Sequence, residues 1–357
     1  MNCAVVGTSG SGKSSLMRAG LLPALHGGFM AQTASVWHVA LMRPGSDPLG
    51  NLAEALSKLA PFKVQDELAH FQAAMLRASL SRSSLGLIET CKQAPLPANE
   101  NLLVVVDQFE ELFRFKQEAQ KSGHGEEAAA FVQLLLEATR QRDLAIFVVL
   151  TMRSDFLGDC AQFRDLPEAI NDGQYLIPRM TREQRRSAIT GPISVAQGEI
   201  ADRLVQRLLN NVGDNPDQLP ILQHALMRTW DYWHVRRQNN SPLDLRDYAK
   251  IGGMAEALSQ HADEAYNELP DDRSRKIAEV IFKRLTEKGA DNREVRRPTS
   301  LQELAEVSEA SIADVVTVIE RFRQTGRSFL MPPPEHTLPR KRRLIFRTKV
   351  LYGNGSD

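Results

Sequence analysis

One loop near the N-terminus constrains this chain more than any other feature of its sequence. Residues 7–14 read GTSGSGKS; they follow the apolar stretch Cys3–Val6 and lead into the helical pattern Ser14–Leu25. Small residues let the backbone fold so that its N–H groups face the phosphates of a nucleotide at a helix N-terminus, where the helix dipole also favours negative charge. The loop therefore predicts a strand–loop–helix unit that binds phosphate groups.

The polar residues of this loop have distinct expected roles. Lys13 adds a point charge, and the Ser14 hydroxyl is a ligand for Mg²⁺, which prefers octahedral oxygen ligands. A plain glycine- and serine-rich turn is the alternative, and the strand before the loop and the helix after it argue against that alternative. The residues expected to contact the nucleotide are Gly7, Thr8, Ser9, Gly10, Ser11, Gly12, Lys13, Ser14 and Ser15.

A second motif follows the apolar run Leu102–Val106, which ends in Asp107 and continues into Glu110 and Glu111. A carboxylate at the end of such a strand is expected to hold Mg²⁺, directly or through water. One of the two glutamates would then orient and deprotonate the attacking water. We predict Glu111 as this base; the alternative interpretation, that a glutamate here is a solvated acid at the start of a helix, applies to at least one of the pair.

A third candidate, Arg153, belongs to the segment TMRS (residues 151–154), which comes directly after the apolar stretch Leu144–Leu150. Ligands bind beyond the carboxyl ends of the strands in a doubly wound sheet, so Arg153 is placed to sense the γ-phosphate. A structural salt bridge is the alternative role for this residue.

Short apolar segments alternate with helical patterns through the first half of the chain. This alternation predicts a parallel sheet covered by helices. The expected strands are Cys3–Val6, Val36–Met42, Leu102–Val106, Leu144–Leu150 and Tyr175–Ile177, and the expected helices are Ser14–Leu25, Asp66–Leu80 and Glu126–Arg142.

After Ile177 the pattern changes to helices alone, beginning with Thr181 and Gln184 at the spacing of a capping box. From Arg273 a helix, a helix started by Ser300, a longer helix and a short apolar segment follow in the order of a winged-helix fold. The predicted domains are therefore a nucleotide-binding domain over residues 1–180, a helical lid over 181–270, a winged helix over 271–335 and a basic, disordered tail over 336–357.

Charge and composition exclude several other classes of protein. Forty-four Lys and Arg residues balance 44 Asp and Glu residues, so no net field attracts the whole chain to nucleic acid or to an anionic membrane. The longest apolar runs are far shorter than the roughly 20 residues of a membrane-spanning helix. Three separated cysteines encode neither a disulfide framework nor a zinc site. We expect a soluble, cytoplasmic protein without a membrane partner.

Together these motifs resemble those of the STAND-class NTPases, signal-transduction ATPases related to the NACHT and NB-ARC families. The match is best to the novel STAND family that is often fused to β-propeller repeats, and it covers about residues 3–335 in order. The matching strings are VVGTSGSGKSSLMRAGLLPAL from Val5, LLVVVDQFEELF from Leu102, VVLTMRSDFLGDC from Val148, YLIPRMTREQRRSAITGP from Tyr175 and DNPDQLPILQHALMRTW from Asp214.

The resemblance implies an AAA-like core with a five-stranded parallel sheet, followed by an all-helical domain and a winged helix. It also implies that ATP or ADP, with Mg²⁺, is held between these domains, with Pro220 near the adenine. The corresponding function is a conformational switch that hydrolyses ATP slowly and forms a homo-oligomer in the ATP state.

The sequence departs from the family pattern at both ends. It starts two residues before the first expected strand, and the His-Glu-Ser strand and fused effector or sensor modules expected after Phe329–Pro334 are absent. We therefore expect a chain truncated at both ends that retains ADP weakly, and we do not assign His336 the role of the missing histidine.

Two alternatives to the switch remain open. One is a nucleotide-regulated protein that binds nucleic acid through the winged helix and basic tail; the other is an inactive fragment of a larger protein. The helix Ile312–Gln324 carries Arg321 and Arg323 but also Asp314 and Glu320, so its surface is not strongly basic and the nucleic-acid alternative is less favoured.

Overall fold

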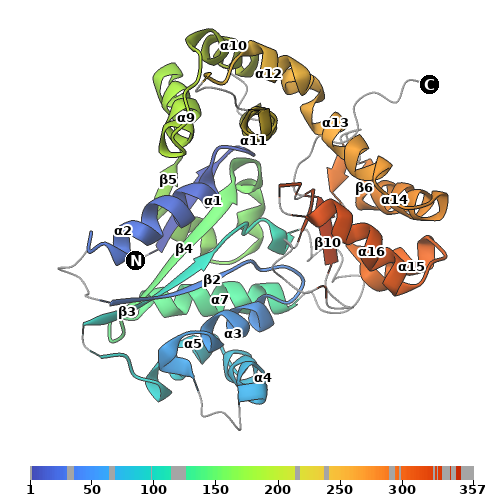
Figure 1. Cartoon of the computed structure of the whole chain (residues 1–357). Helices are drawn as coiled ribbons and strands as arrows, with labels where there is room; N and C mark the ends of the chain where they lie inside the picture. Colours follow the sequence, from blue (N-terminus) through green and yellow to red (C-terminus); the bar gives the residue numbers. More distant parts are fainter. Residues whose placement is uncertain are drawn as a thin grey trace. The chain divides into compact units, whose positions relative to one another are not determined.

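The chain divides into two compact units, residues 1–179 and 180–357, in the computed structural model (Figure 1). The structure describes residues 2–29, 36–63, 69–97, 99–113, 126–213, 218–236, 241–288, 294–296, 299–324, 326–327, 329–331, 338 and 343–346.

The first unit is built on a five-stranded parallel sheet with the strand order β2-β3-β4-β1-β5. Its strands are β1 (Asn2–Gly7), β2 (Val36–Met42), β3 (Glu100–Val106), β4 (Ile146–Arg153) and β5 (Gln174–Leu176). The predicted parallel sheet is confirmed. Strand β4 continues past the apolar run to Arg153, because Thr151 and Arg153 still pair with Val5 and Gly7 of β1.

Helical segments connect the parallel strands, as such crossovers require. They are α1 (Lys13–Ser15), η1 (Leu16–Leu21), α2 (Leu22–His26), α3 (Pro48–Ser57), η2 (Ala60–Phe62), α4 (Ala69–Leu80), α5 (Gly86–Gln93), α7 (Glu126–Arg140), η4 (Ser154–Phe156), η5 (Gly158–Gln162) and α8 (Leu166–Asp172). The expected helix after the glycine-rich loop is present, but its middle part, η1, is a π-helix. The short helices α3, α5 and α8 were not predicted.

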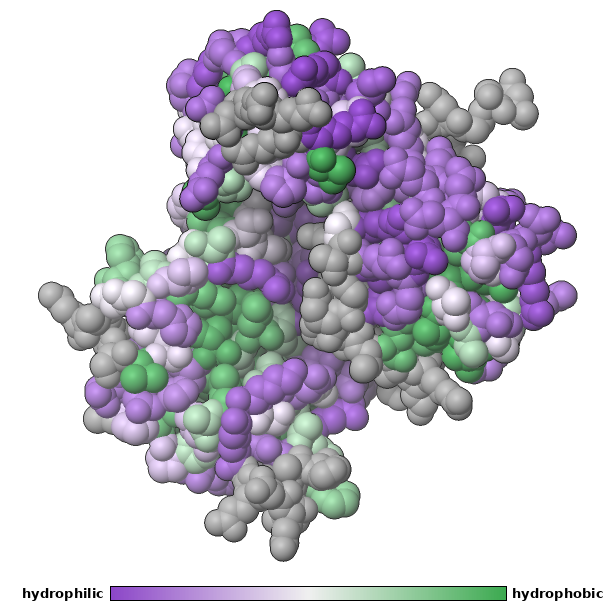
Figure 2. All heavy atoms as spheres, in the orientation of Figure 1, coloured by the Kyte–Doolittle hydropathy of each residue, from purple (hydrophilic) through white to green (hydrophobic). Residues whose placement is uncertain are grey.

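The sheet separates two hydrophobic cores because successive side chains of a strand point to opposite faces. In β3, Leu102, Val104 and Val106 pack with α3, α5, α7 and α8 in the larger core. Leu103 and Val105 face the smaller core beneath α1, η1 and α2. Figure 1 shows the two groups of helices on opposite sides of the sheet. The smaller core includes partly buried apolar side chains of β2 and β4, and apolar residues are visible over this part of the first unit in Figure 2.

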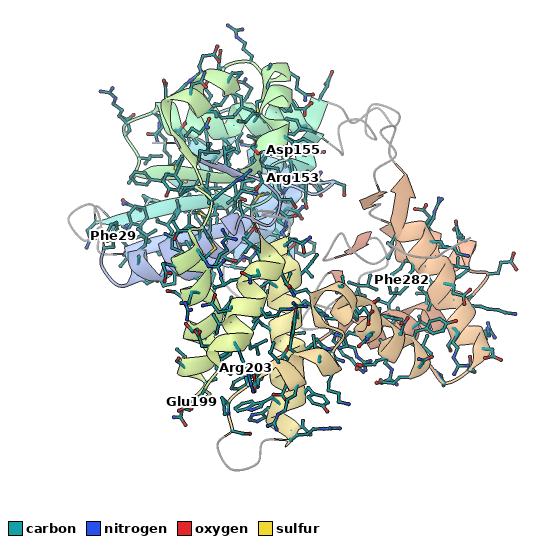
Figure 3. The ribbon with its side chains drawn as sticks, turned by 90° about the horizontal axis from the view of Figure 1, so that it is seen from above. Phe29, Arg153, Asp155, Glu199, Arg203 and Phe282 are labelled. Carbon is teal, nitrogen blue, oxygen red and sulfur yellow. The ribbon has the colours of Figure 1, made fainter. Side chains whose placement is uncertain are left out.

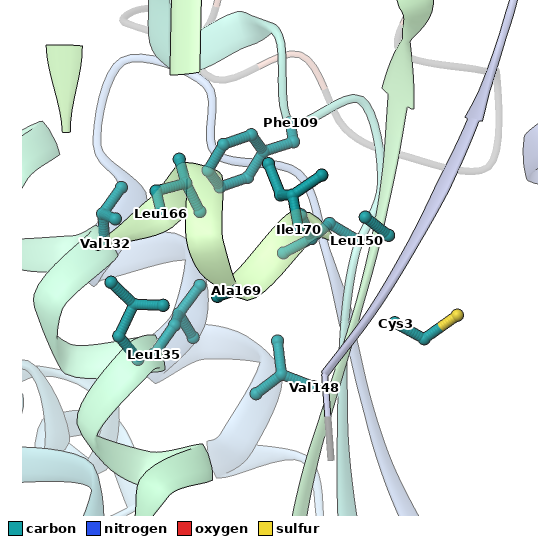
Figure 4. Close-up of a pocket in the computed structure, with 11 residues that line it drawn as sticks. Cys3, Phe109, Val132, Leu135, Val148, Leu150, Leu166, Ala169 and Ile170 are labelled. Carbon is teal, nitrogen blue, oxygen red and sulfur yellow. The ribbon is translucent and has the colours of Figure 1, made fainter. Parts of the chain in front are cut away.

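A small cavity lies within the larger core, between the strands β1 and β4 and the helices α7 and α8 (Figure 4). Its volume is about 20 Å³, which is room for about one water molecule. Phe109, from the turn after β3, lines it together with Cys3 and apolar side chains of the core. This cavity is too small for a nucleotide, so the candidate site must lie elsewhere.

The second unit begins with helices that pack around a core of their own. They are α9 (Arg182–Val195), α10 (Asp202–Val212), α11 (Leu219–Arg236), α12 (Leu245–Lys250) and α13 (Gly253–Asn267). The predicted capping box at Thr181 and Gln184 is confirmed. Helix α9 continues through Pro192, and Ile189 and Ile193 pack into the same core.

The rest of the second unit combines helices with short strands. These elements are α14 (Asp272–Leu285), β6 (Thr286–Lys288), β7 (Glu294–Arg296), β8 (Thr299–Ser300), α15 (Leu301–Val307), α16 (Ile312–Arg323), β9 (Leu330–Met331) and β10 (Arg343–Phe346). Strand β10 pairs antiparallel with both β8 and β9, and β6 pairs with β7.

Strand β10 corrects one prediction, because residues 343–346 fall in the segment expected to be a disordered tail. The basic residues of this segment dominated the sequence pattern and concealed the apolar run Leu344–Phe346, which has the composition of a short strand. His336 and residues 347–357 lie outside the described residues. In the part of the chain that the structure describes, no helix combines the length and apolar character needed to cross a membrane.

Candidate functional site

The loop between β1 and α1 has a backbone conformation that depends on its glycines. Gly10 and Gly12 have φ values of 74° and 87°, in the left-handed region that side chains with a Cβ rarely adopt. Gly7 ends β1 at a close approach, since an added Cβ there would lie 2.6 Å from Ser11 Oγ. The glycines therefore permit the tight turn that leads from the strand into the helix.

The side chain of Lys13 is hydrogen-bonded to the backbone of this same loop. Its Nζ donates hydrogen bonds to the carbonyl oxygens of Gly7, at 2.9 Å, and Thr8, at 2.7 Å. Burial lowers the pKa of Lys13, and the negative charge of Glu110 is the largest influence in the opposite direction. The ammonium group is thus partly removed from water and lies against the loop that is expected to bind phosphate.

Asp107 joins three elements of the sheet edge. Its side chain is 1% exposed, and its Oδ1 accepts hydrogen bonds from Ser14 Oγ at 2.7 Å and from Thr151 Oγ1 at 2.6 Å. Helix α1, the end of β3 and the end of β4 therefore meet at one carboxylate oxygen. We did not predict the role of Thr151, although its hydroxyl at the end of an apolar strand was a usable signal.

The second oxygen of Asp107 has different surroundings. Oδ2 is buried and accepts no hydrogen bond from the described residues. One guanidinium nitrogen each of Arg18 and Arg43 lies 3.7 Å away. Neither arginine was identified from the sequence. The position of Arg43 directly after β2 was the available signal, because ligands bind beyond the carboxyl ends of parallel strands.

The oxygen atoms of Ser14 and Asp107 fit the preference of Mg²⁺ for hard ligands, and Asp107 Oδ2 is a buried acceptor with capacity for a cation. Among the described residues, no group of three His, Cys, Asp or Glu side chains forms a metal cage. Such a site suits Mg²⁺ that keeps waters and phosphate oxygens in its coordination sphere.

The two glutamates after Asp107 have different surroundings. Glu110 is 6% exposed, and its Oε2 accepts a weak hydrogen bond from the backbone N–H of Arg153 at 3.4 Å. Burial raises the pKa of Glu110, while the charges of Lys13 and Arg153 act to lower it. The half-buried Glu111 instead accepts a hydrogen bond from the backbone N–H of Gly45 at 3.0 Å. The geometry thus associates Glu110 with Lys13 and Arg153, and Glu111 with the turn after β2.

Gln108 lies in the turn between Asp107 and the two glutamates. Its φ of 59° is unusual for a residue with a side chain, and its backbone N–H donates to Thr151 Oγ1 at 3.0 Å. When its amide is oriented to satisfy its neighbours, the nitrogen donates to Glu111 and the oxygen accepts from Arg43, both at 3.1 Å. Glu111 and Arg43 are therefore connected through one side chain.

Arg153 lies at the carboxyl end of β4. Its Nε donates to Asp155 Oδ1 at 2.9 Å, and a second guanidinium nitrogen pairs with the other carboxylate oxygen. Figure 3 shows the two side chains together. The guanidinium carbon also lies 5.5 Å from the centroid of the Phe156 ring. The salt bridge considered for Arg153 is therefore present, while the side chain remains 21% exposed.

Pro220, the residue expected near the adenine, belongs to the second unit. It is the second residue of α11, in the first helical turn, where proline's missing N–H leaves no intrahelical bond unmade. Its expected contact with the base remains a prediction.

The sequence profile of the novel STAND NTPase 1 family matches residues 1–331. The chain belongs to this family. The motifs that carried the resemblance thus lie in a novel STAND NTPase, and the family assignment supports nucleotide binding and NTPase activity. Among curated proteins, none matches this NTPase.

Solved structures similar to this novel STAND NTPase include archaeal and bacterial proteins. The ORC2 protein of Aeropyrum pernix in its ADP form is 13% identical with a TM-score of 0.50, over 99% of this chain and 84% of that chain. The A. pernix ORC1 protein in complex with DNA is 15% identical with a TM-score of 0.47, over 98% and 83%. The Thermotoga maritima RuvB Holliday junction branch migration motor is 15% identical with a TM-score of 0.39, over 97% and 85%. The likeness to ORC2 shows a similar fold.

Replacing Lys13 by alanine should weaken ATP binding about tenfold or more, because a charge-assisted hydrogen bond to phosphate is lost. Binding of a fluorescent ATP analogue measures the effect, and thermal unfolding checks the fold. The control is Lys58→Ala, which removes an exposed lysine that pairs with Glu54 on α3. Equal ATP affinity of Lys13→Ala and the parent chain would contradict the assignment.

Proposed function

We propose that this NTPase is an ATP-dependent switch whose slow hydrolysis sets the lifetime of an ATP-bound, homo-oligomeric state. The observation that carries the proposal is the shared carboxylate oxygen of Asp107, which accepts hydrogen bonds from Ser14 and Thr151. Glu110 and Arg153 lie at the same edge of the sheet and contact each other through a backbone N–H. A triphosphate on the glycine-rich loop would thus influence β1, β3 and β4 together.

The loop and its lysine form the proposed phosphate site. The backbone N–H groups of residues 7–15 would bind the β- and γ-phosphates, and Lys13 would exchange its carbonyl partners for phosphate oxygens. Ser14 and Asp107 would hold Mg²⁺, which when bound neutralises phosphate charge. The phosphate groups would thereby replace the contacts of Lys13 with the carbonyl oxygens of Gly7 and Thr8.

We assign the role of general base to Glu110 and not to Glu111, which the sequence had favoured. A base must take a proton from the attacking water, and its pKa must lie close enough to the working pH to accept that proton. Burial moves the pKa of Glu110 in that direction, and this carboxylate interacts with Lys13 and Arg153. Glu111 would act as a positioning residue, because its hydrogen bond to Gly45 holds the turn after β2.

Arg153 is the proposed sensor of the γ-phosphate. Its guanidinium is paired with Asp155, so a γ-phosphate would have to compete with this carboxylate. ATP offers that phosphate and ADP does not. A ligand shifts a conformational equilibrium only by its differential affinity for the two states, and this competition supplies such a difference.

We also propose that the second unit contains an all-helical lid, α9–α13, followed by a winged helix that extends to β10. The chain order α14, β6, β7, β8, α15, α16, β9 and β10, with β10 between β8 and β9 in one sheet, supports this proposal. The family resemblance implies that Pro220 contacts the adenine of ATP or ADP.

The nucleic-acid alternative has less support. Arg321 on α16 lies 3.6 Å from Glu268, and Arg273 lies 3.2 Å from Asp314, an acid of α16. Arg327 also pairs with Glu268. These cations are paired with acids of the same unit, which favours a packing role for α16 over contact with nucleic acid phosphates.

Glu110→Gln should retain ATP but slow its hydrolysis at least about a hundredfold, as expected when a positioned base is lost. Glu111→Gln is the matched control, and it should slow the reaction much less. Single-turnover assays with the full chain measure both rates. The reverse order of the two variants would overturn the assignment of Glu110.

The pH dependence should identify the same residue. Because burial raises the pKa of Glu110, a larger share of this group is protonated, and inactive as a base, at mildly acidic pH than for an ordinary glutamate. Hydrolysis by the parent chain should therefore fall as pH decreases through this raised pKa. The residual activity of Glu110→Gln should lack that decrease, and an unchanged pH profile would argue that another group titrates.

Arg153→Ala should lower the affinity for ATP about tenfold while changing that for ADP much less, because only ATP offers the γ-phosphate. Asp155→Asn is the matched control: it weakens the competing ion pair and should increase the preference for ATP. Calorimetric titration with each nucleotide measures both effects. Equal loss of ATP and ADP affinity in Arg153→Ala would show that the residue is structural.

A further inference from the structure

Two positively charged side chains flank the carboxylate that is expected to hold Mg²⁺. The distances to Asp107 Oδ2 are 3.7 Å from both Arg18 and Arg43, yet this oxygen accepts no hydrogen bond from the described residues. A buried carboxylate without enough hydrogen bonds requires compensating charge. The guanidinium groups of Arg18 and Arg43 are placed to supply that charge.

Arg43 is fixed to this position more firmly than Arg18. The backbone N–H of Asp107 donates to the carbonyl oxygen of Met42 at 2.8 Å, which brings the end of β2 beside Asp107. Arg43 also donates to the Gln108 amide oxygen at 3.1 Å. Its side chain is 33% exposed, compared with 53% for Arg18, so water screens its charge less.

The turn after Arg43 is itself held in place. Asn51 Nδ2 donates to the carbonyl oxygen of Pro44 at 2.8 Å, and the backbone N–H of Gly45 donates to Glu111 at 3.0 Å. Gly45 has a φ of 56°, which favours glycine. Arg43 is therefore attached to a defined turn at the end of β2, and moving its guanidinium away from Asp107 breaks its hydrogen bond with Gln108.

We propose that Arg43 is an internal counter-ion of Asp107 that competes with Mg²⁺ and sets the metal concentration at which the site binds Mg²⁺-ATP. This inference rests on the proposed function, since it assumes that Asp107 holds the metal of a bound nucleotide. Mg²⁺ and the guanidinium of Arg43 both require the negative charge of Oδ2. Metal binding must therefore weaken the contact with Arg43, and through Gln108 it would be coupled to Glu111 and the Gly45 turn.

The opposite role, direct binding of phosphate by Arg43, predicts an effect of opposite sign. Removing a competing counter-ion should strengthen metal binding. Removing a phosphate-binding cation should weaken nucleotide binding whether or not metal is present. Measurements with and without metal therefore separate the two roles.

The experiment compares the full-length parent chain with Arg43→Gln, Arg43→Lys and Arg18→Gln. Binding of a fluorescent ATP analogue is titrated against Mg²⁺, and Mn²⁺ binding in the presence of ATP is followed by electron paramagnetic resonance. Arg43→Gln should lower the metal concentration for half-saturation about threefold or more. Arg43→Lys should lie closer to the parent, because it keeps the charge.

Arg18→Gln is the control for a general field effect, since Arg18 lies at the same distance from Asp107 Oδ2 as Arg43. It should shift the metal requirement less than Arg43→Gln does. Equal shifts for the two variants, no shift, or a higher metal requirement in Arg43→Gln would each overturn the proposal. A parent chain that binds ATP with no response to metal would instead overturn the proposed function, and this inference with it.

Discussion

The rest of the candidate site depends on the hydrogen bonds and charges that compensate the buried carboxylate of Asp107. A charged group at 1% exposure is costly unless hydrogen bonds and opposite charges compensate it. Hydroxyl groups from the loop helix and from β4 compensate one oxygen, and two arginines lie near the other. The position of Asp107 thus explains the polar Thr151 directly after the apolar run of β4, and it connects β3 and β4 to helix α1.

This arrangement explains how a small chemical difference in the nucleotide could reach several elements. Ser14, which follows the glycine-rich loop, is hydrogen-bonded to Asp107. The proposed base Glu110 is hydrogen-bonded to the backbone N–H of Arg153 at the end of β4. A γ-phosphate, which ATP has and ADP lacks, would compete with the ion pair between Arg153 and Asp155. The proposed switch therefore needs no long pathway within the first unit.

Much of this site was predictable because its motifs are local in sequence. The glycine-rich loop and the alternation of strands and helices each follow from neighbouring residues, and the parallel sheet is confirmed. The different surroundings of Glu110 and Glu111 were not predictable, since they depend on a turn in which Gln108 has a positive φ. Arg43 was missed because its contact with Asp107 joins distant parts of the chain. The second half was predicted less completely, because charge patterning obscured β10.

The most direct test of this account is the effect of Asp107→Asn on the Mg²⁺ dependence of ATP binding, measured by calorimetry on the full chain. Asparagine keeps the shape of the side chain but removes the charge that Mg²⁺ requires. The account predicts that Mg²⁺ strengthens ATP binding by the parent chain. In the variant, the factor by which Mg²⁺ increases ATP affinity should be smaller by about tenfold or more, while the affinity for ATP without metal should not be weakened. An Asp107→Asn variant that responds to Mg²⁺ as the parent does would contradict the central role of Asp107.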